Sequence, residues 1–147
     1  MTHKKKIAID CRMYNHSGIG TFIQGILGQI VNYPQYKFLL IGKKDIIKNY
    51  ISENVSILDC NLEIFSFKEL FYFPTKEVNS CDLLLCPNFN LPGGVKIPII
   101  SVIHDVLFLD NPKVVKSRIG RYIRKVFIRR AIFKSKEIIT VSEFSKK

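Results

Sequence analysis

The residues of this sequence best suited to chemistry lie just after its first apolar run. Residues 7–13 are mostly apolar, and the turn that follows contains Ser17, Gly18, Ile19 and Gly20. A helical pattern begins at once behind this turn. Glycine lets a backbone approach a ligand closely, and the start of a helix offers unpaired N–H groups at the positive end of its dipole. This arrangement predicts a turn that binds the phosphate of a nucleotide or of another phosphorylated compound.

The two glycines alone do not identify the ligand. A dinucleotide-binding fingerprint would have a third glycine at position 23, which is Ile23, and an acidic residue near the end of the second strand. The second apolar run instead ends in Gly42, Lys43 and Lys44. These departures argue against a nicotinamide dinucleotide, and a plain tight turn without a ligand is the alternative.

A second candidate is the polar pair His104 and Asp105, which ends the strongly apolar run of residues 97–103. An imidazole titrates near neutral pH and therefore suits substrate contact or proton transfer. The alternative is a histidine whose hydrogen bonds are satisfied by the backbone of its own loop.

Apolar runs and helical patterns alternate along the 147 residues, which fit one domain. The runs that predict strands are residues 7–13, 37–42, 55–60, 81–86, 97–103 and 137–141. Helices are predicted at 21–33, 45–52 and 113–136, and residues 62–73 fit either state. Apolar strands separated by helices predict an α/β fold, a Rossmann-like open parallel sheet with helices on both faces.

Ligands of such sheets bind beyond the carboxyl ends of the strands. Several of the candidate residues follow a predicted strand, although they lie far apart in the sequence. We therefore expect one crevice to bring together Gly18, Gly20, His104, Asp105 and Ser142.

The net charge of +11 favours an anionic partner: nucleic acid, an acidic membrane surface or a phosphorylated ligand. The helix predicted at 113–136 carries no acid, and its apolar stripe is Val115, Ile119, Tyr122, Val126 and Phe133. The bases expected at a membrane surface are Arg118, Arg121, Arg124, Lys125, Arg129 and Arg130. A core helix with a solvated basic face is the alternative. We expect no nucleic-acid partner, because no helix-turn-helix, zinc-finger or aromatic stacking motif accompanies the charge.

The cysteines and histidines of the sequence indicate the cellular compartment and whether a metal site is expected. The four cysteines form no C-x-x-C pair, which predicts buried free thiols in a reducing compartment. No Cys/His cluster has metal-ligand spacing, so no metal site is expected.

The basic start resembles that of a signal peptide, but Asp10 and Arg12 break the apolar segment behind it. The prediction is a cytoplasmic protein without a membrane span, associated at most peripherally with the inner face of the membrane.

Three ordered segments resemble a known family: Ile9-Asp-Cys-Arg12 with Ser17-Gly-Ile-Gly20, then Ser101-Val-Ile-His-Asp105, then Ile138-Ile-Thr-Val-Ser-Glu-Phe-Ser145. Together they are similar to the amino-terminal domain of family 4 (group 1) glycosyltransferases, which are retaining enzymes of the GT-B fold. The most similar members resemble mannosyltransferases that build bacterial surface polysaccharides.

The resemblance implies an enzyme with a cleft between two Rossmann-like halves. The amino-terminal half would bind a saccharide or lipid-linked acceptor, and the other half the nucleotide-sugar donor. The 18–20 loop would approach the donor diphosphate, His104 would lie beside the transferred sugar, and Asp105 would order the loop. The cleft would also be lined by Arg12, Ser142, Glu143 and Phe144. No cofactor is implied, because the nucleotide sugar is a substrate.

The family's donor site uses a basic residue and two glutamates of the second domain, which would lie beyond Lys147. The resemblance therefore implies that these 147 residues are the acceptor-side half, with little or no turnover alone. Two other function classes remain open: a nucleotide-binding Rossmann-like module without catalysis, and a basic nucleic-acid-binding protein.

Overall fold

The central element of the fold is strand β1 (Lys6–Asp10), which lies between β2 (Lys37–Gly42) and β4 (Leu83–Cys86). In the computed structural model, the described residues (4–30, 32–104 and 118–141) form a six-stranded sheet in the order β3-β2-β1-β4-β5-β6. All its strand pairs are parallel, and the remaining strands are β3 (Val55–Asp59), β5 (Ile99–Ile103) and β6 (Glu137–Thr140). The predicted Rossmann-like α/β fold is confirmed.

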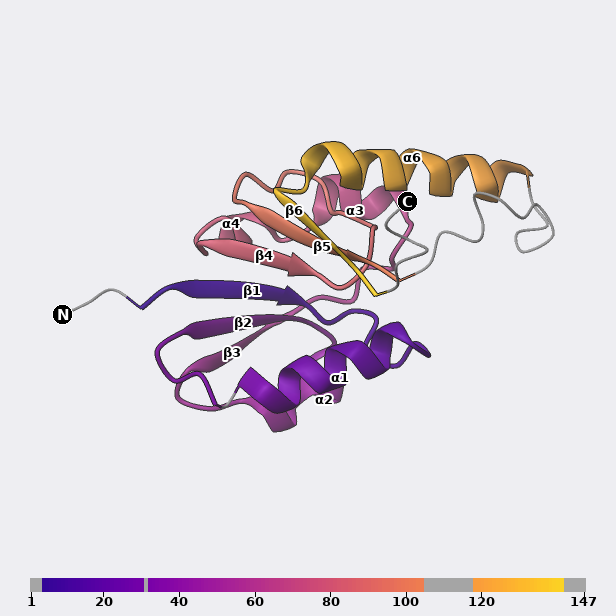
Figure 1. Cartoon of the computed structure of the whole chain (residues 1–147). Helices are drawn as coiled ribbons and strands as arrows, with labels where there is room; N and C mark the ends of the chain where they lie inside the picture. The colour runs from indigo at the N-terminus through magenta and orange to yellow at the C-terminus, as the bar shows by residue number, and fades with distance from the viewer. Residues whose placement is uncertain (1–3, 31, 105–117, 142–147) are drawn as a thin grey trace.

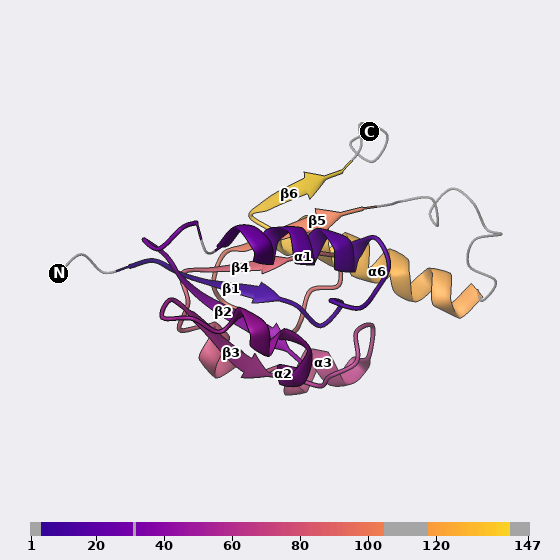
Figure 2. The same ribbon diagram turned by 90° about the horizontal axis from the view of Figure 1, so that it is seen from below.

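Helices cover both faces of the sheet, as Figure 1 shows. Because successive strand residues point to opposite faces, Ala8 and its neighbours form one core cluster and Ile9 and its neighbours another. The Ala8 face packs against α3 (Phe67–Tyr72), α4 (Thr75–Val78) and α6 (Arg118–Lys134). The Ile9 face packs against α1 (Ile19–Ile30) and α2 (Lys44–Ile47), which leads into the short 3-10 helix η1 (Lys48–Tyr50). Figure 2 shows α1 lying across that face.

Most differences from the predicted bounds have local causes. Strand β1 ends at Asp10 rather than at residue 13 because the Asp10 carboxylate accepts the backbone N–H of Arg12 (3.1 Å), which turns the chain. The ambiguous segment 62–73 contains α3, which ends before Phe73 and Pro74 because the residue before a proline is held extended. The single-turn helix α4 was not predicted.

The order of strands reverses between β1 and β4. The chain builds outward from β1 through β2 to β3, then crosses back to form β4 on the other side of β1 and continues outward to β6. The connections above the carboxyl ends of β1 and β4 therefore lead away from each other, which leaves the crevice where ligands of such sheets bind. Both the β1–α1 turn and the residues after β4 lie at this edge.

No helix in the described segments has the length and the apolar composition that crossing a bilayer requires.

Two glycines of α1 make a matched test of the turn. A Cβ at Gly20 would overlap the backbone carbonyl of Tyr14, whereas a Cβ at Gly28 would meet open space. We expect Gly20→Ala to lower the free energy of unfolding by about 1–3 kcal/mol, as overpacking does. Gly28→Ala should raise it by about 0.5–1 kcal/mol, because alanine is the better helix former. Urea denaturation of both variants measures the difference, and equal effects would contradict the proposed close contact.

Candidate functional site

A hollow of about 450 Å³ lies at the carboxyl ends of β1, β4 and β5. It is lined by the β1–α1 turn and the first residue of α1, the segment before α3, the segment after β4, the end of β5 with His104, and one residue of α6. The lining residues are Met13, His16, Ile19, Ile64, Phe65, Asn88, Phe89, Val102, His104 and Arg124. The structure therefore brings His16 and Ile19 of the predicted turn together with His104 and Arg124, whereas Gly18 and Gly20 are not among the lining residues.

His104 is half-buried, and its ring has defined contacts on two sides. Its Nε2 lies 2.9 Å from the carbonyl oxygen of Pro87. A carbonyl only accepts, so Nε2 carries the proton and donates it. The ring also meets the edge of Phe22, with centroids 5.1 Å apart. The backbone thus satisfies one ring nitrogen, and Nδ1 is left as the nitrogen that a ligand in the hollow can engage.

The β1–α1 turn contributes side chains more than amides to the hollow. Gly18 has a φ of 65°, a left-handed conformation that favours glycine. The N–H of Ile19 donates to Ser17 (2.6 Å) and that of Gly20 donates to His16 (2.7 Å). Gly20 is buried, whereas Ser17 and Gly18 are exposed beside the hollow. The predicted phosphate contact through the amides of Ile19 and Gly20 would therefore require these internal bonds to open.

Arg12, which was predicted to line the cleft, turns its guanidinium into the protein instead. Its side chain is 3% exposed and lies between two carboxylates, 2.7 Å from Asp10 Oδ2 and 2.8 Å from Glu69 Oε2. The guanidinium carbon lies 5.0 Å from the ring centre of Phe73. Arg12 also borders a smaller hollow of about 390 Å³, near Lys43. The guanidinium stays in the interior, because moving it out would leave both carboxylates buried without a partner and would lower the free energy of unfolding.

Burial and charge act against each other in this triad. Burial lowers the pKa of Arg12, but the adjacent charges of Asp10 and Glu69 outweigh it and the pKa is raised. Burial raises the pKa of Glu69, and the charge of Arg12 opposes that shift without cancelling it. The guanidinium is therefore a permanent cation, and its ion pair with Glu69 weakens when the carboxyl is protonated.

A chain of hydrogen bonds connects the triad to the hollow. Asn90 Nδ2 donates to Glu69 Oε1 (2.7 Å), and the backbone N–H of Asn90 donates to Asn88 Oδ1 (2.5 Å). Asn88 Nδ2 in turn lies 2.9 Å from Met13 Sδ. Both Asn88 and Met13 line the hollow. The buried ions thus fix the position of one of its walls.

Phe65 shapes another wall from a strained backbone. It is a non-glycine residue with a φ of 58°, and its ring packs against Phe89 and Phe127 at centroid distances of 5.6 and 5.7 Å. The guanidinium carbon of Arg124 lies 5.7 Å from the same ring. Such conformations persist only where the surroundings hold them, and they cluster at ligand sites.

The bases predicted for a membrane surface divide into different environments. Arg118, Lys125 and Arg129 are exposed. Arg124 instead lines the hollow, and Arg130 donates to the carbonyls of Leu91 (3.4 Å) and Pro92 (3.0 Å). These last two are half-buried and face the protein, whereas the first three are free to serve the predicted surface role. Six further residues named in the sequence analysis lie outside the residues whose structure or side chain is described: Asp105, Val115, Arg121, Ser142, Glu143 and Phe144.

Sequence reasoning missed His16, Asn88 and Arg124 as residues of the hollow. Asn88 had a usable signal, because it follows β4 as His104 follows β5. His16 belongs to the predicted turn but was not singled out within it. Arg124 had no signal, since its place depends on how α6 packs.

All four cysteines are free and buried, as predicted, and burial raises the pKa of Cys11, Cys60, Cys81 and Cys86. Across the described part of the chain, no group of His, Cys, Asp and Glu side chains has the arrangement of a metal site.

The triad predicts a large difference between two arginine variants. Arg12→Ala leaves two buried carboxylates without their cation, and we expect the free energy of unfolding to fall by about 3–5 kcal/mol. Arg129→Ala, at an exposed position of α6, should change it by less than about 0.5 kcal/mol. Chemical denaturation followed by circular dichroism measures both. A small effect of Arg12→Ala would show that the triad does not hold the fold together.

No family model matches this chain, and no curated protein is significantly similar to it in sequence.

Proposed function

We propose that this chain is the acceptor-side half of a retaining glycosyltransferase that moves a sugar from a nucleotide-sugar donor to a saccharide or lipid-linked acceptor in surface polysaccharide synthesis. The observation that carries this proposal is the convergence of the β1–α1 turn and His104 on one hollow at the carboxyl edge of a Rossmann-like sheet. The sequence resemblance described above supplies the reaction class.

The chemistry of the hollow suits a sugar that carries a phosphate. Nδ1 of a neutral His104 accepts a hydrogen bond from a sugar hydroxyl, because Nε2 already donates to Pro87. Arg124 and His16 supply positive charge or N–H donors for a phosphate. Phe65 and Phe89 offer apolar surface to the faces of a sugar ring. The volume of about 450 Å³ lies within the range of small-molecule sites.

Breaking the bond between a sugar and a nucleotide leaves negative charge on the departing diphosphate, which fixed cations must stabilise. On the resemblance, most of those cations come from a second domain that closes over this edge. Arg124 and His16 would add to them from this side.

Titration of the chain with UDP, GDP and their mannose conjugates tests this proposal. NMR shifts should be confined to the residues of the hollow. Arg124→Gln should weaken binding about tenfold or more, the effect of losing one charge-assisted hydrogen bond. Arg129→Gln removes the same charge from an exposed position of the same helix and should leave binding unchanged.

Tighter binding of NAD than of any sugar nucleotide would instead favour a nucleotide-binding module without catalysis. Rapid sugar transfer by the 147 residues alone would contradict the proposed division of labour between two halves.

We further propose that α6 lies against an anionic membrane. Its stripe of Ile119, Tyr122, Val126 and Phe133 is exposed, with exposed fractions of 73%, 70%, 46% and 84%. The core contact is made instead by Phe127, Ile128 and Ala131. At about 100° per residue, the exposed bases Arg118, Lys125 and Arg129 lie along one side of this stripe. Exposed apolar residues flanked by bases are typical of helices that lie in a membrane interface.

Flotation with vesicles rich in phosphatidylglycerol tests this second proposal. Replacing Arg118, Lys125 and Arg129 by Glu should abolish binding, and added salt should weaken binding of the unaltered chain. The matched control replaces Lys43, Lys44 and Lys48 by Glu, exposed residues beside and within the α2 region on the opposite face of the sheet. Equal loss in both triple variants would show that only net charge matters and would overturn the assignment to α6.

A further inference from the structure

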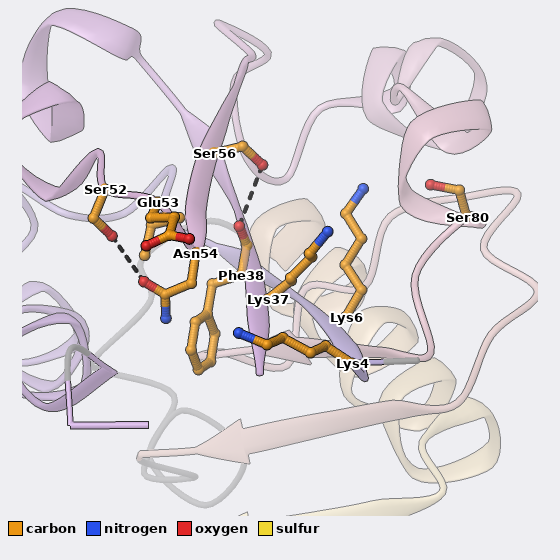
Figure 3. A pocket seen from close by; sticks show the side chains of 10 residues that line it. Lys4, Lys6, Lys37, Phe38, Ser52, Glu53, Asn54, Ser56 and Ser80 are labelled. Atoms are coloured by element: carbon orange, nitrogen blue, oxygen red, sulfur yellow. Dashed lines mark hydrogen bonds between the residues drawn. The ribbon is translucent and has the colours of Figure 1, made fainter. Parts of the chain in front are cut away.

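A second hollow, of about 750 Å³, lies at the opposite edge of the sheet, at the amino ends of β1, β2 and β3 (Figure 3). It shares no residue with the hollow of the proposed function. Most of its lining residues are polar or basic: Lys4, Lys6, Lys37, Phe38, Ser52, Glu53, Asn54, Val55, Ser56 and Ser80. Three lysines against one glutamate give these residues an excess of positive charge.

Lys6 and Lys37 are forced to be neighbours by the register of the sheet. They are directly paired residues of β1 and β2. Paired residues of adjacent parallel strands point to the same face, and the strands are only about 4.8 Å apart. In Figure 3 the two side chains run together, and their ammonium groups point the same way, between Ser56 and Ser80. Both lysines therefore bring positive charge to the same side of this edge of the sheet.

No carboxylate of the described segments forms an ion pair with Lys6 or Lys37. The nearby carboxylate of Asp82 pairs with the side chain of Lys5 at 3.2 Å and accepts the backbone N–H of Lys6 at 2.8 Å. The third lysine of the lining, Lys4, directs its ammonium to the carbonyl of Pro34 (2.8 Å). Both lysines therefore line the hollow without an ion-pair partner among the described residues.

We propose that this second hollow binds a compact polyanion that carries two or more phosphate groups. Lysine ammonium groups act as point charges with several donors, which suits phosphate oxygens. The hydroxyls of Ser56 and Ser80 flank the pair, and each already donates to a backbone carbonyl, Phe38 (3.3 Å) and Glu77 (2.6 Å). The lysines would therefore carry most of the binding. This site is independent of the proposed glycosyl transfer, because the two hollows lie at opposite edges of the sheet.

Calorimetric titration of the 147-residue chain with inorganic pyrophosphate tests the proposal. We expect Lys6→Gln with Lys37→Gln to weaken binding by about tenfold or more, which corresponds to about 1.4 kcal/mol. The control double variant, Lys68→Gln with Lys76→Gln, removes the same charge from exposed positions of α3 and α4 and should bind as the unaltered chain does. Monophosphate, with fewer charges, should bind more weakly than pyrophosphate.

Thermal melting gives a second readout that does not depend on calorimetry. Pyrophosphate should raise the Tm of the unaltered chain and of the control variant, because a ligand of the folded state stabilises it. It should not raise the Tm of the Lys6/Lys37 variant, because that variant lacks the proposed phosphate-binding charges.

The phosphate groups could belong to a soluble compound or to a lipid headgroup, and vesicles of phosphatidylcholine with and without phosphatidic acid distinguish these sources. Because α6 is itself proposed to bind anionic vesicles, the readout is a difference: weaker binding to the phosphatidic acid vesicles in the Lys6/Lys37 variant, but not in the control variant, would assign the site to a lipid headgroup. Absence of both pyrophosphate and vesicle binding, or equal losses in the two double variants, would overturn the proposal. NMR shifts at His104 and Arg124 in place of Lys6 and Lys37 would overturn it too.

Discussion

The buried ion triad of Arg12, Asp10 and Glu69 is the constraint on which the functional edge of this protein depends. Two carboxylates and one guanidinium lie almost out of reach of water at the carboxyl end of the central strand. Charges so buried are tolerated only when each has its partner in good geometry. The triad therefore requires β1, α3 and the loop after β4, which joins through Asn90, to hold fixed relative positions.

The ion triad also fixes the position of residues that line the hollow. Asn88 and Phe89 belong to the loop that Asn90 ties to Glu69, and Phe65 precedes α3 by two residues. A rigid ionic anchor behind the site and an open apolar front are consistent with ligand binding, since groups that contact a ligand must be held in place by others that do not. The same reasoning explains why Arg12 serves the hollow without entering it.

Much of the fold followed from patterns that are local in sequence. The run of β2 is apolar throughout and was predicted at its observed bounds, residues 37–42. The rule that ligands bind at carboxyl ends of parallel strands predicted that the β1–α1 turn and His104 lie near each other. His16 and Ile19 of that turn do share a hollow with His104, although they are far apart in the chain. The inward turn of Arg12 could not be predicted in this way. Its partner Glu69 lies 57 residues away, in a segment whose apolar residues fit both helix and strand spacing.

Helix α6 shows why periodicity alone was insufficient for the rest. A stripe at helical spacing says which residues share a face, but not whether that face meets the core or the outside. The predicted stripe faces outward. Phe127, Ile128 and Ala131, which lie about a quarter of a turn or more away around the helix, contact the core instead. As a result, one helix presents Arg124 to the hollow and exposed bases and apolar side chains to the surroundings. Under the proposed function this geometry has a use. A lipid-linked acceptor held in the membrane beneath α6 would reach the hollow over no more than the width of a helix, so the surface that binds the membrane and the residues that bind the sugar would be positioned by the same rigid element.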